Sequence, residues 1–180
     1  MMHMNTSRER GFTLIELMTA LSIFLVVMTV SMGSILGIFD ANRKSHTLKA
    51  VMTSLNLALE GMSREMRYGR NYHCGATGTI TTPQNCAGGA TSMSFLDAYN
   101  VQVTYRLNGT MLERQEGTGS FQPVTSPEAL IDAFTFYTVG AGTDNLLQPK
   151  VLIAVKAHAG TKQRTDFTLQ TLVSQRALDI

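Results

Sequence analysis

The sequence predicts an α+β protein in which one long N-terminal helix precedes an antiparallel β-sheet head. Three observations lead to this prediction: an uncharged apolar run at residues 17–39, an amphipathic helical pattern that continues to residue 68, and alternating strand patterns from residue 92 onward. The chain of 180 residues has room for one modest domain and some additional segments. Because the helical signals come first and the strand signals follow, we expect a helix packed on a sheet.

The charge of the chain is nearly balanced. There are 15 Lys and Arg residues against 13 Asp and Glu residues, which gives a formal net charge of +2. A charge this small and this dispersed does not form the broad basic surface of a nucleic-acid-binding domain. The composition therefore does not indicate nucleic acid as a partner.

The apolar run at residues 17–39, LMTALSIFLVVMTVSMGSILGIF, contains no charged residue. A helix needs about 20 apolar residues to cross the hydrocarbon core of a bilayer, so this run is long enough to span. A secretory signal peptide has a shorter apolar region that is followed by its cleavage site. Here the charged residues 8–10 precede the run, so we expect the run to stay in the mature protein. The charges at Arg43 and Lys44 leave the orientation open.

The residues before the run form a recognisable junction, Arg10-Gly11-Phe12-Thr13-Leu14-Ile15-Glu16-Leu17. It combines a basic leader ending in Gly, an aromatic residue directly after it, a Thr-Leu-Ile run, an early Glu and the apolar helix. In this it resembles the type IV pilin and type II secretion pseudopilin family. The resemblance implies a pilin-like fold, cleavage between Gly11 and Phe12 by a prepilin peptidase, and methylation of the new amine of Phe12. The match is specific over about residues 8–39 only.

Glu16 is a carboxylate about one helical turn into an apolar segment. Charges inside a membrane are costly and usually have a partner. The resemblance implies that Glu16 pairs with the N-terminal amine of a neighbouring subunit and sets the stagger between subunits during assembly. The alternative is that Glu16 lies near a helix N-terminus, where the helix dipole favours an anion. We favour the assembly role.

Gly33 and Gly37 form a small-x-x-x-small pair within the span. Such a pair lets helices approach closely in lipid, and each glycine also lowers helix stability by about 1 kcal/mol relative to alanine. Many members of the resembling family have proline where Gly33 falls, and this chain departs from that pattern. Local melting of the helix in a filament and ordinary tolerated glycines are both open interpretations.

Beyond the span, residues 40–69 are expected to form the amphipathic half of the same helix. Gly69 is placed to end the helix after Tyr68. Arg64 and Arg67 recur with Arg70 at every third position, which suggests either a solvated helix end or a small DNA-binding patch; we favour the former. Apolar residues spaced by four and three positions give one stripe, which consists of Leu48, Met52, Leu55, Leu59, Met62 and Met66.

The head is expected to be an antiparallel meander. Alternating residues on both sides of Asn108-Gly109 predict a hairpin, since this dipeptide favours a tight turn. Another turn is expected at Gly160-Thr161-Lys162. The expected strands lie at residues 92–96, 101–107, 110–115, 131–139, 151–158 and 165–174.

Residues 70–91 are expected to be the loop that links the helix to the sheet. Cys74 and Cys86 lie in this segment and are close enough in sequence for a disulfide, which would contribute roughly 3 kcal/mol. Free thiols are the alternative, because disulfides persist only outside the reducing cytosol. A zinc site with His73 lacks a second pair of ligands.

The head shows no catalytic motif in its sequence. His73 and His158 have no nucleophile motif or metal-spaced cluster beside them. A turn at Asp144 and Asn145 suggests a calcium site only weakly, because calcium takes six to eight oxygen ligands. We therefore expect no enzyme activity and no cofactor.

Together these features predict five segments: a leader at 1–11 that is removed, a transmembrane and assembly helix at 12–39, its amphipathic half at 40–69, the loop at 70–91 and the head at 92–180. The expected function is that of a structural subunit of a type IV pilus or a secretion pseudopilus, with its head outside the inner membrane. The final strand resembles that of minor pilins and J-class pseudopilins.

The expected partners are prepilin peptidase, other pilin or pseudopilin subunits, the inner-membrane assembly platform and the lipid bilayer. Two alternatives stay open. One is a DNA-uptake or adhesion pilin whose head binds a ligand, and the other is a simple membrane-anchored extracytoplasmic domain that keeps its leader.

Overall fold

The structure is a computed structural model that describes residues 11–142, 147–160 and 164–176. The chain divides into two compact units, Met1–Arg43 and Lys44–Ile180. Among the described residues, the first unit holds only helix and the short segment before it. The second unit holds the rest of the helix and every strand.

A single helix, α1, runs from Leu14 to Tyr68. Its end falls where the sequence predicted it, and packing explains why. A Cβ added at Gly69 would lie 2.6 Å from Cδ2 of Phe95, so only glycine fits between the helix end and the sheet. The Gly69 N–H donates to the carbonyl oxygen of Met66 at 3.0 Å, which closes the last turn.

The second half of α1 buries one apolar stripe, as predicted, with one correction. Val51 is fully buried, whereas Met52 is only partly buried. The predicted stripe included Met52 where the structure buries Val51, because spacings of four and three fit several starting points on a helix of 3.6 residues per turn. The buried stripe consists of Val51, Leu55, Leu59, Met62 and Met66.

The strands form two antiparallel sheets, which confirms the α+β class. The first sheet has the order β1-β3-β4-β5-β6. Its strands are β1 (Arg70–Cys74), β3 (Ser92–Leu96), β4 (Gln102–Asn108), β5 (Met111–Glu116) and β6 (Gln122–Pro123).

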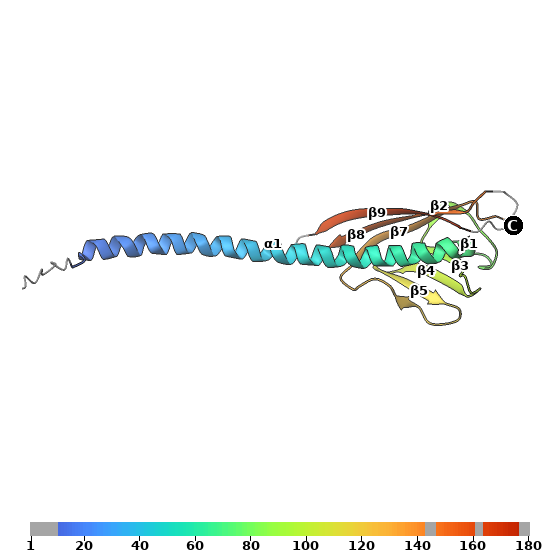
Figure 1. The fold of residues 1–180 in the computed structure, drawn as a ribbon, viewed down its shortest axis with the longest axis horizontal. Helices are drawn as coiled ribbons and strands as arrows, with labels where there is room; N and C mark the ends of the chain where they lie inside the picture. Colours follow the sequence, from blue (N-terminus) through green and yellow to red (C-terminus); the bar gives the residue numbers. More distant parts are fainter. Residues whose placement is uncertain (1–10, 143–146, 161–163, 177–180) are drawn as a thin grey trace, which may run out of the picture. The chain divides into compact units, whose positions relative to one another are not determined.

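The second sheet has the order β2-β7-β8-β9. Its strands are β2 (Cys86–Ala90), β7 (Leu130–Val139), β8 (Lys150–Ala159) and β9 (Thr165–Ser174). In Figure 1, β7, β8 and β9 lie along one side of the second half of α1, and β3, β4 and β5 lie along the other.

Two predictions about the head were wrong. The segment 70–91 is not a loop, since it contains β1 and β2, and the strands form two sheets rather than one meander. β2 has the sequence CAGGA, whose glycines hide it from a propensity argument. Its pairing with β7, far along the chain, makes it a strand.

The six strands expected from the alternating patterns are all present within about one residue. The hairpin between β4 and β5 is also present, although Asn108 is the last residue of β4 and Gly109 and Thr110 form the turn. Gly109 has φ +60, a conformation that glycine adopts without strain. The turn at 160–162 lies partly outside the described residues, and the suggested calcium turn at Asp144 and Asn145 lies wholly outside them.

The core lies where the helical stripe meets the inner faces of both sheets. Phe134 and Phe136 of β7 pack edge to face, with ring centroids 4.9 Å apart. Tyr72 of β1 packs in the same way against Phe95 of β3, at 6.1 Å. Both aromatic pairs belong to one hydrophobic cluster that also contains the buried stripe of the helix.

Candidate functional site

The junction that precedes α1 is exposed. Gly11, Phe12 and Thr13 all lie outside the helix, and the Phe12 side chain is 83% exposed. A Cβ added at Gly11 would meet no atom within 4 Å. No packing within this part of the structure therefore requires glycine at position 11. The folded chain by itself does not explain why this residue is glycine.

Glu16 lies in the first turn of α1 and interacts with the residue that caps the helix. The Glu16 N–H donates to Oγ1 of Thr13, and the Thr13 hydroxyl donates to Oε2 of Glu16, both at 3.4 Å. A Thr at the cap with a Glu three residues later is the sequence pattern of a capping box, of which the bond from the Glu16 N–H is formed here. The sequence pattern Thr-x-x-Glu could have predicted this pair, and our sequence reasoning missed it. These bonds are long, and the Glu16 side chain stays exposed and open to a further partner.

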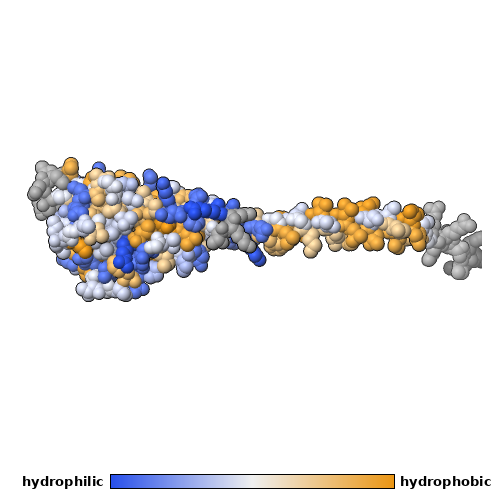
Figure 2. Space-filling view, turned by 180° about the vertical axis from the view of Figure 1, so that it is seen from behind, coloured by the Kyte–Doolittle hydropathy of each residue, from blue (hydrophilic) through white to orange (hydrophobic). Residues whose placement is uncertain are grey.

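The first half of α1 exposes apolar side chains on all its surface. Every large apolar side chain from Phe12 to Phe39 is at least half exposed. Figure 2 shows this segment as a nearly continuous hydrophobic surface on the side in view. By length and composition this helix could cross a membrane. In water so much apolar surface would be unfavourable, at about 25 cal/mol per Å².

Gly33 and Gly37 lie within a helix that is continuous through both positions. A Cβ at either would meet no atom within 4 Å. The glycines therefore leave space that no described residue of this chain fills. Close approach of a second helix remains a proposal for these positions.

Cys74 and Cys86 are joined in a disulfide, with Cα atoms 5.6 Å apart. Cys74 belongs to β1 and Cys86 to β2, so the bond links an edge of one sheet to an edge of the other. Because both sulfurs are bonded, neither can serve as a thiolate ligand, and this rules out the zinc site considered with His73.

His73 is only 1% exposed and lies beside this disulfide. Its Nδ1 is 2.7 Å from the carbonyl oxygen of Thr82, and its Nε2 is 2.9 Å from that of Thr77. A ring N–H donated to one of these carbonyl oxygens fastens the chain between the two cysteines. The role of His73 is structural, as the sequence suggested for an isolated histidine.

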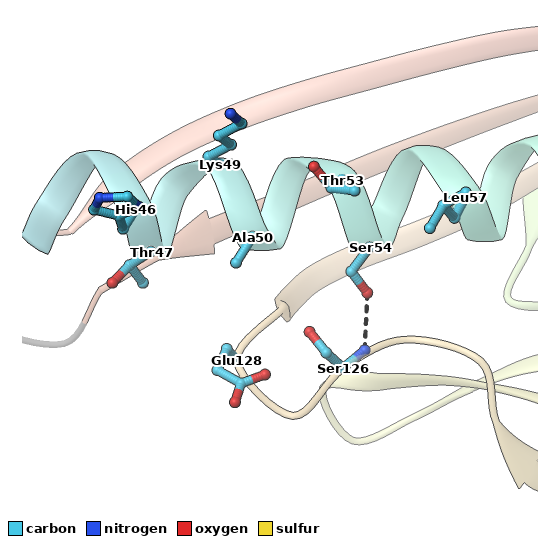
Figure 3. Close-up of a pocket in the computed structure, with 9 residues that line it drawn as sticks. All are labelled: His46, Thr47, Lys49, Ala50, Thr53, Ser54, Leu57, Ser126 and Glu128. Atoms are coloured by element: carbon cyan, nitrogen blue, oxygen red, sulfur yellow. Dashed lines mark hydrogen bonds between the residues drawn. The ribbon is translucent and has the colours of Figure 1, made fainter.

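An open groove lies between the second half of α1 and the segment that leads into β7. Figure 3 shows its nine lining residues, with Ser54 pointing towards Ser126. The Ser126 N–H donates to Oγ of Ser54 at 2.9 Å, so Ser54 fastens the segment that leads into β7 to the helix. Lys49 points away from that bond. The arrangement holds structure together and offers no reactive pair.

One histidine and two carboxylates meet at the start of β9. Donor atoms of Asp132, His158 and Asp166 lie within 4.8 Å of one another, which is close enough to hold a cation. Arg164 already lies there, with Nη2 2.9 Å from Asp132 and Nε 2.6 Å from Asp166. The hydrogen bond to Asp166, together with the charges of both carboxylates, raises the pKa of the Arg164 guanidinium. The guanidinium thus offsets one of the two negative charges of the cluster.

Basic and aromatic side chains meet near the C-terminal end of α1. The Arg176 guanidinium lies 5.7 Å from the ring centroid of Tyr68 and donates to its hydroxyl at 3.1 Å. Arg67 lies in the same region, and its carbonyl oxygen accepts from the Arg176 N–H at 2.9 Å. Tyr68 is 52% exposed and places an aromatic ring beside these arginines.

Comparison with protein families matched residues 6–32 to the prokaryotic N-terminal methylation motif. The matched segment contains Gly11, Phe12 and Glu16 and ends inside the apolar half of α1. Comparisons with curated proteins and with solved structures gave no match. The head therefore has to be interpreted from its own geometry.

Proposed function

We propose that this chain is a structural subunit assembled into a pilus or a secretion pseudopilus. The N-terminal methylation motif supports its membership of the type IV pilin and pseudopilin family. Prepilin peptidase would remove residues 1–11, and the new amine of Phe12 would be methylated. The apolar half of α1 would then anchor the subunit in the inner membrane and pack against other subunits. The subunit itself would carry out no catalysis.

The observation that carries this proposal is the combination at the start of α1. An accessible Gly11–Phe12 junction is followed at once by a helix whose apolar surface is exposed on every side. A prepilin needs both, because the peptidase must reach the junction and the helix must remain for assembly. The pilin-like α+β fold agrees with this function, because the amphipathic half of the helix packs on sheets of the same chain.

The finer assignment is to a minor subunit of the J-class kind. It rests on the final strand, FTLQTLVS within β9, and on a disulfide that joins β1 to β2 rather than lying around the last strands. The inner-membrane assembly platform and neighbouring minor subunits would be its partners.

Mass spectrometry of the protein extracted from membranes of its own cell tests the processing step. We expect a mature chain that begins at methylated Phe12, and we expect the Gly11→Ala variant to keep its leader. Gly61→Ala is the matched control, because a Cβ at Gly61 also meets no atom within 4 Å. An intact leader in the wild-type protein would contradict the proposal and would leave a simple membrane-anchored domain.

The role of Glu16 can be separated from its local bonds to Thr13. Glu16→Gln keeps the oxygen that accepts from Thr13 and loses the charge, whereas Thr13→Val removes the hydroxyl and keeps the charge. If pairing with a neighbour's amine is the function, incorporation into filaments should fall for Glu16→Gln and persist for Thr13→Val. The reverse result would mean that Glu16 only caps the helix.

A DNA-uptake subunit is the second candidate, and the cluster of Arg67, Arg176 and Tyr68 favours it. Arginine beside an exposed aromatic ring can contact phosphate and stack on bases. Fluorescence anisotropy with labelled DNA and the full chain in detergent would test it. Binding that weakens with salt and is lost in Arg67→Ala/Arg176→Ala would support the candidate, whereas no binding at low salt would exclude it.

A further inference from the structure

Each of the two sheets ends in two edge strands, which gives the head four edges. β1 and β6 are the edges of the first sheet, and β2 and β9 are those of the second. An edge strand presents unpaired N–H and C=O groups that can pair with another chain, so proteins usually protect their edges. The four edges of this head differ in that protection.

Three edges are short or interrupted. β6 has two residues, one of them proline, and β2 has five residues with a register shift and two glycines. β1 also has a register shift, and its outer side is occupied: the Cys74 N–H donates to the carbonyl oxygen of Gln84, and the Gln84 N–H donates to that of Tyr72. Each of these features limits pairing with a further strand.

β9 has none of these protections. It is ten residues long and pairs with β8 at ten consecutive positions without a register shift. Its sequence, TDFTLQTLVS, contains no proline, glycine or lysine. β9 is therefore the one long and regular edge among the described strands, and Figure 1 shows it along the rim of its sheet.

The register identifies which main-chain groups of β9 face away from β8. The Gln175 N–H donates to the carbonyl oxygen of Pro149 at 3.0 Å, so Gln175 is in a hydrogen-bonded pair. In an antiparallel ladder such pairs alternate with pairs whose groups point outward. Thr168, Gln170 and Leu172 thus direct their N–H and C=O groups outward, and among the described residues these groups have no hydrogen-bond partner on that side.

The apolar side chains of β9 are only partly covered by the rest of the head. Phe167 and Leu169 face the core but stay only partly buried, since no strand lies beyond them. On the opposite face Leu172 is 60% exposed. An added strand would cover apolar surface on both faces and would also satisfy the outward main-chain groups.

We propose that β9 is the docking edge for an extended segment of a different protein subunit, which adds to the second sheet as a fifth strand. Free main-chain groups along a regular edge define the chemistry of the occupant, which is a peptide in β conformation. Symmetric antiparallel pairing with β9 of a second copy would point the second halves of the two α1 helices in opposite directions. Two copies anchored in one membrane would not adopt that pairing, an argument that rests on the proposed function.

Site-specific photo-crosslinking of the full-length protein in its own cells tests this edge. A benzophenone amino acid replaces Leu172. The control carries it at Tyr99, which is 86% exposed in the turn between β3 and β4 of the other sheet. Thr168→Pro removes one outward N–H without removing a hydrogen bond to β8, and Thr168→Ala removes only the side chain. Gln170→Lys adds a charge to the edge as a second variant.

We expect an adduct with another protein at position 172 that is absent at position 99. Its yield should fall on the order of tenfold in Thr168→Pro, because the partner then loses a hydrogen bond and keeps a buried unpaired carbonyl. It should also fall in Gln170→Lys and be unchanged in Thr168→Ala. Equal melting temperatures of the variants would show that the fold is intact.

The proposal is overturned by an adduct of two copies of this chain, by equal adduct yields in Thr168→Pro and Thr168→Ala, or by no adduct above the Tyr99 control. Cleavage of the leader is measured on the same samples. An uncleaved chain with a Pro-sensitive adduct would contradict the proposed function and keep the docking edge. A cleaved chain without such an adduct would do the reverse.

Discussion

The two halves of α1 belong to one uninterrupted helix, yet they are stabilised by different surroundings. From Val51 to Met66 the helix buries a stripe under two sheets. From Leu14 to Phe39 it buries nothing within the described chain, although this part is the more apolar one. The second half has its packing partner in the same chain, whereas the first half has none among the described residues.

This difference shows what hydrophobic pattern can and cannot tell. A stripe on one face indicates that the partner surface lies in the same protein. An apolar surface all around indicates an environment supplied from outside. The capping pair of Thr13 and Glu16 at the start, and Gly69 at the end, define one helix that serves both environments.

The largest expected effect compares the same substitution in the two halves. Met62 is fully buried and Met28 is 53% exposed. Met62→Ala should lower the free energy of unfolding of the head by about 2–5 kcal/mol, because it leaves a cavity in the core. Met28→Ala should leave it unchanged. Hydrogen exchange of β8 amides, measured on the full chain in detergent micelles, would report both values.

Met28→Ala is the matched control because methionine and alanine are both good helix formers. If the two variants destabilised the head equally, the halves of α1 would be one cooperative unit and the comparison would fail. If neither did, the stripe would not support the head.

The next effect concerns the covalent link between the sheets. Cys74→Ala/Cys86→Ala removes the disulfide that joins β1 to β2. A loop of about this size should contribute roughly 3 kcal/mol to the free energy of unfolding of the head. Filament assembly through the first half of α1 should not depend on it directly. Denaturation of the oxidised wild type and the double variant would measure the difference, and equal midpoints would contradict the prediction.

Much of the fold could be predicted because the relevant signals are local. Alternation along β7, β8 and β9 and the Asn108-Gly109 hairpin are visible within a few residues of sequence. The missed elements depend on distant pairing. β2 is a strand because Cys86 and Ala90 pair with Thr138 and Phe136 of β7, which no local pattern reveals.

The features of the candidate sites differ in the same way: some could be predicted from local sequence and others could not. Gly11, Phe12 and Glu16 lie in one short segment and could be found by resemblance, and the methylation motif matched that segment. The free edge of β9 could not be found, because exposure of an edge is known only when all neighbouring strands are placed. The contact between Arg176 and Tyr68 could not be found either, because the two residues lie far apart along the chain.

A smaller effect on stability is expected when substitutions of Glu65 and Glu60, both in the second half of α1, are compared. Oε2 of Glu65 accepts from the Tyr105 hydroxyl at 2.8 Å and from Arg114 Nε at 3.1 Å, which joins the helix to the first sheet. Burial lowers the pKa of the Arg114 guanidinium, but hydrogen bonds to Glu116 and Glu65 raise that pKa above its ordinary value.

Glu65→Gln should cost about 1–2 kcal/mol of the free energy of unfolding, because it weakens charge-assisted hydrogen bonds. Glu60 pairs only with exposed Arg64, at 3.1 Å, so Glu60→Gln should cost less than about 0.5 kcal/mol. Urea denaturation of both variants would compare them. Equal costs would mean that the contact between helix and sheet adds nothing beyond an exposed ion pair.

The smallest effect is a pH dependence that the second half of α1 imposes on the sheet. Tyr105 is 3% exposed, and its burial, the charge of Glu65 and their hydrogen bond raise its pKa well above the ordinary value near 10. In the unfolded chain the phenol loses its proton above about pH 10, while in the folded chain it stays protonated. Loss of that proton favours the unfolded chain, so this contribution to stability is complete below pH 10 and decreases as the pH rises above it.

Raising the pH from 9 to 10.5 should therefore lower the free energy of unfolding of the wild type by about 1 kcal/mol more than that of Tyr105→Phe, which has no phenol proton to lose. All other side chains are the same in the two proteins, so the difference between the two curves isolates Tyr105. Urea denaturation at several pH values would measure it. Parallel curves would mean that Tyr105 ionises as readily in the folded protein as in the unfolded one, and that Glu65 does not hold the phenol in its neutral form.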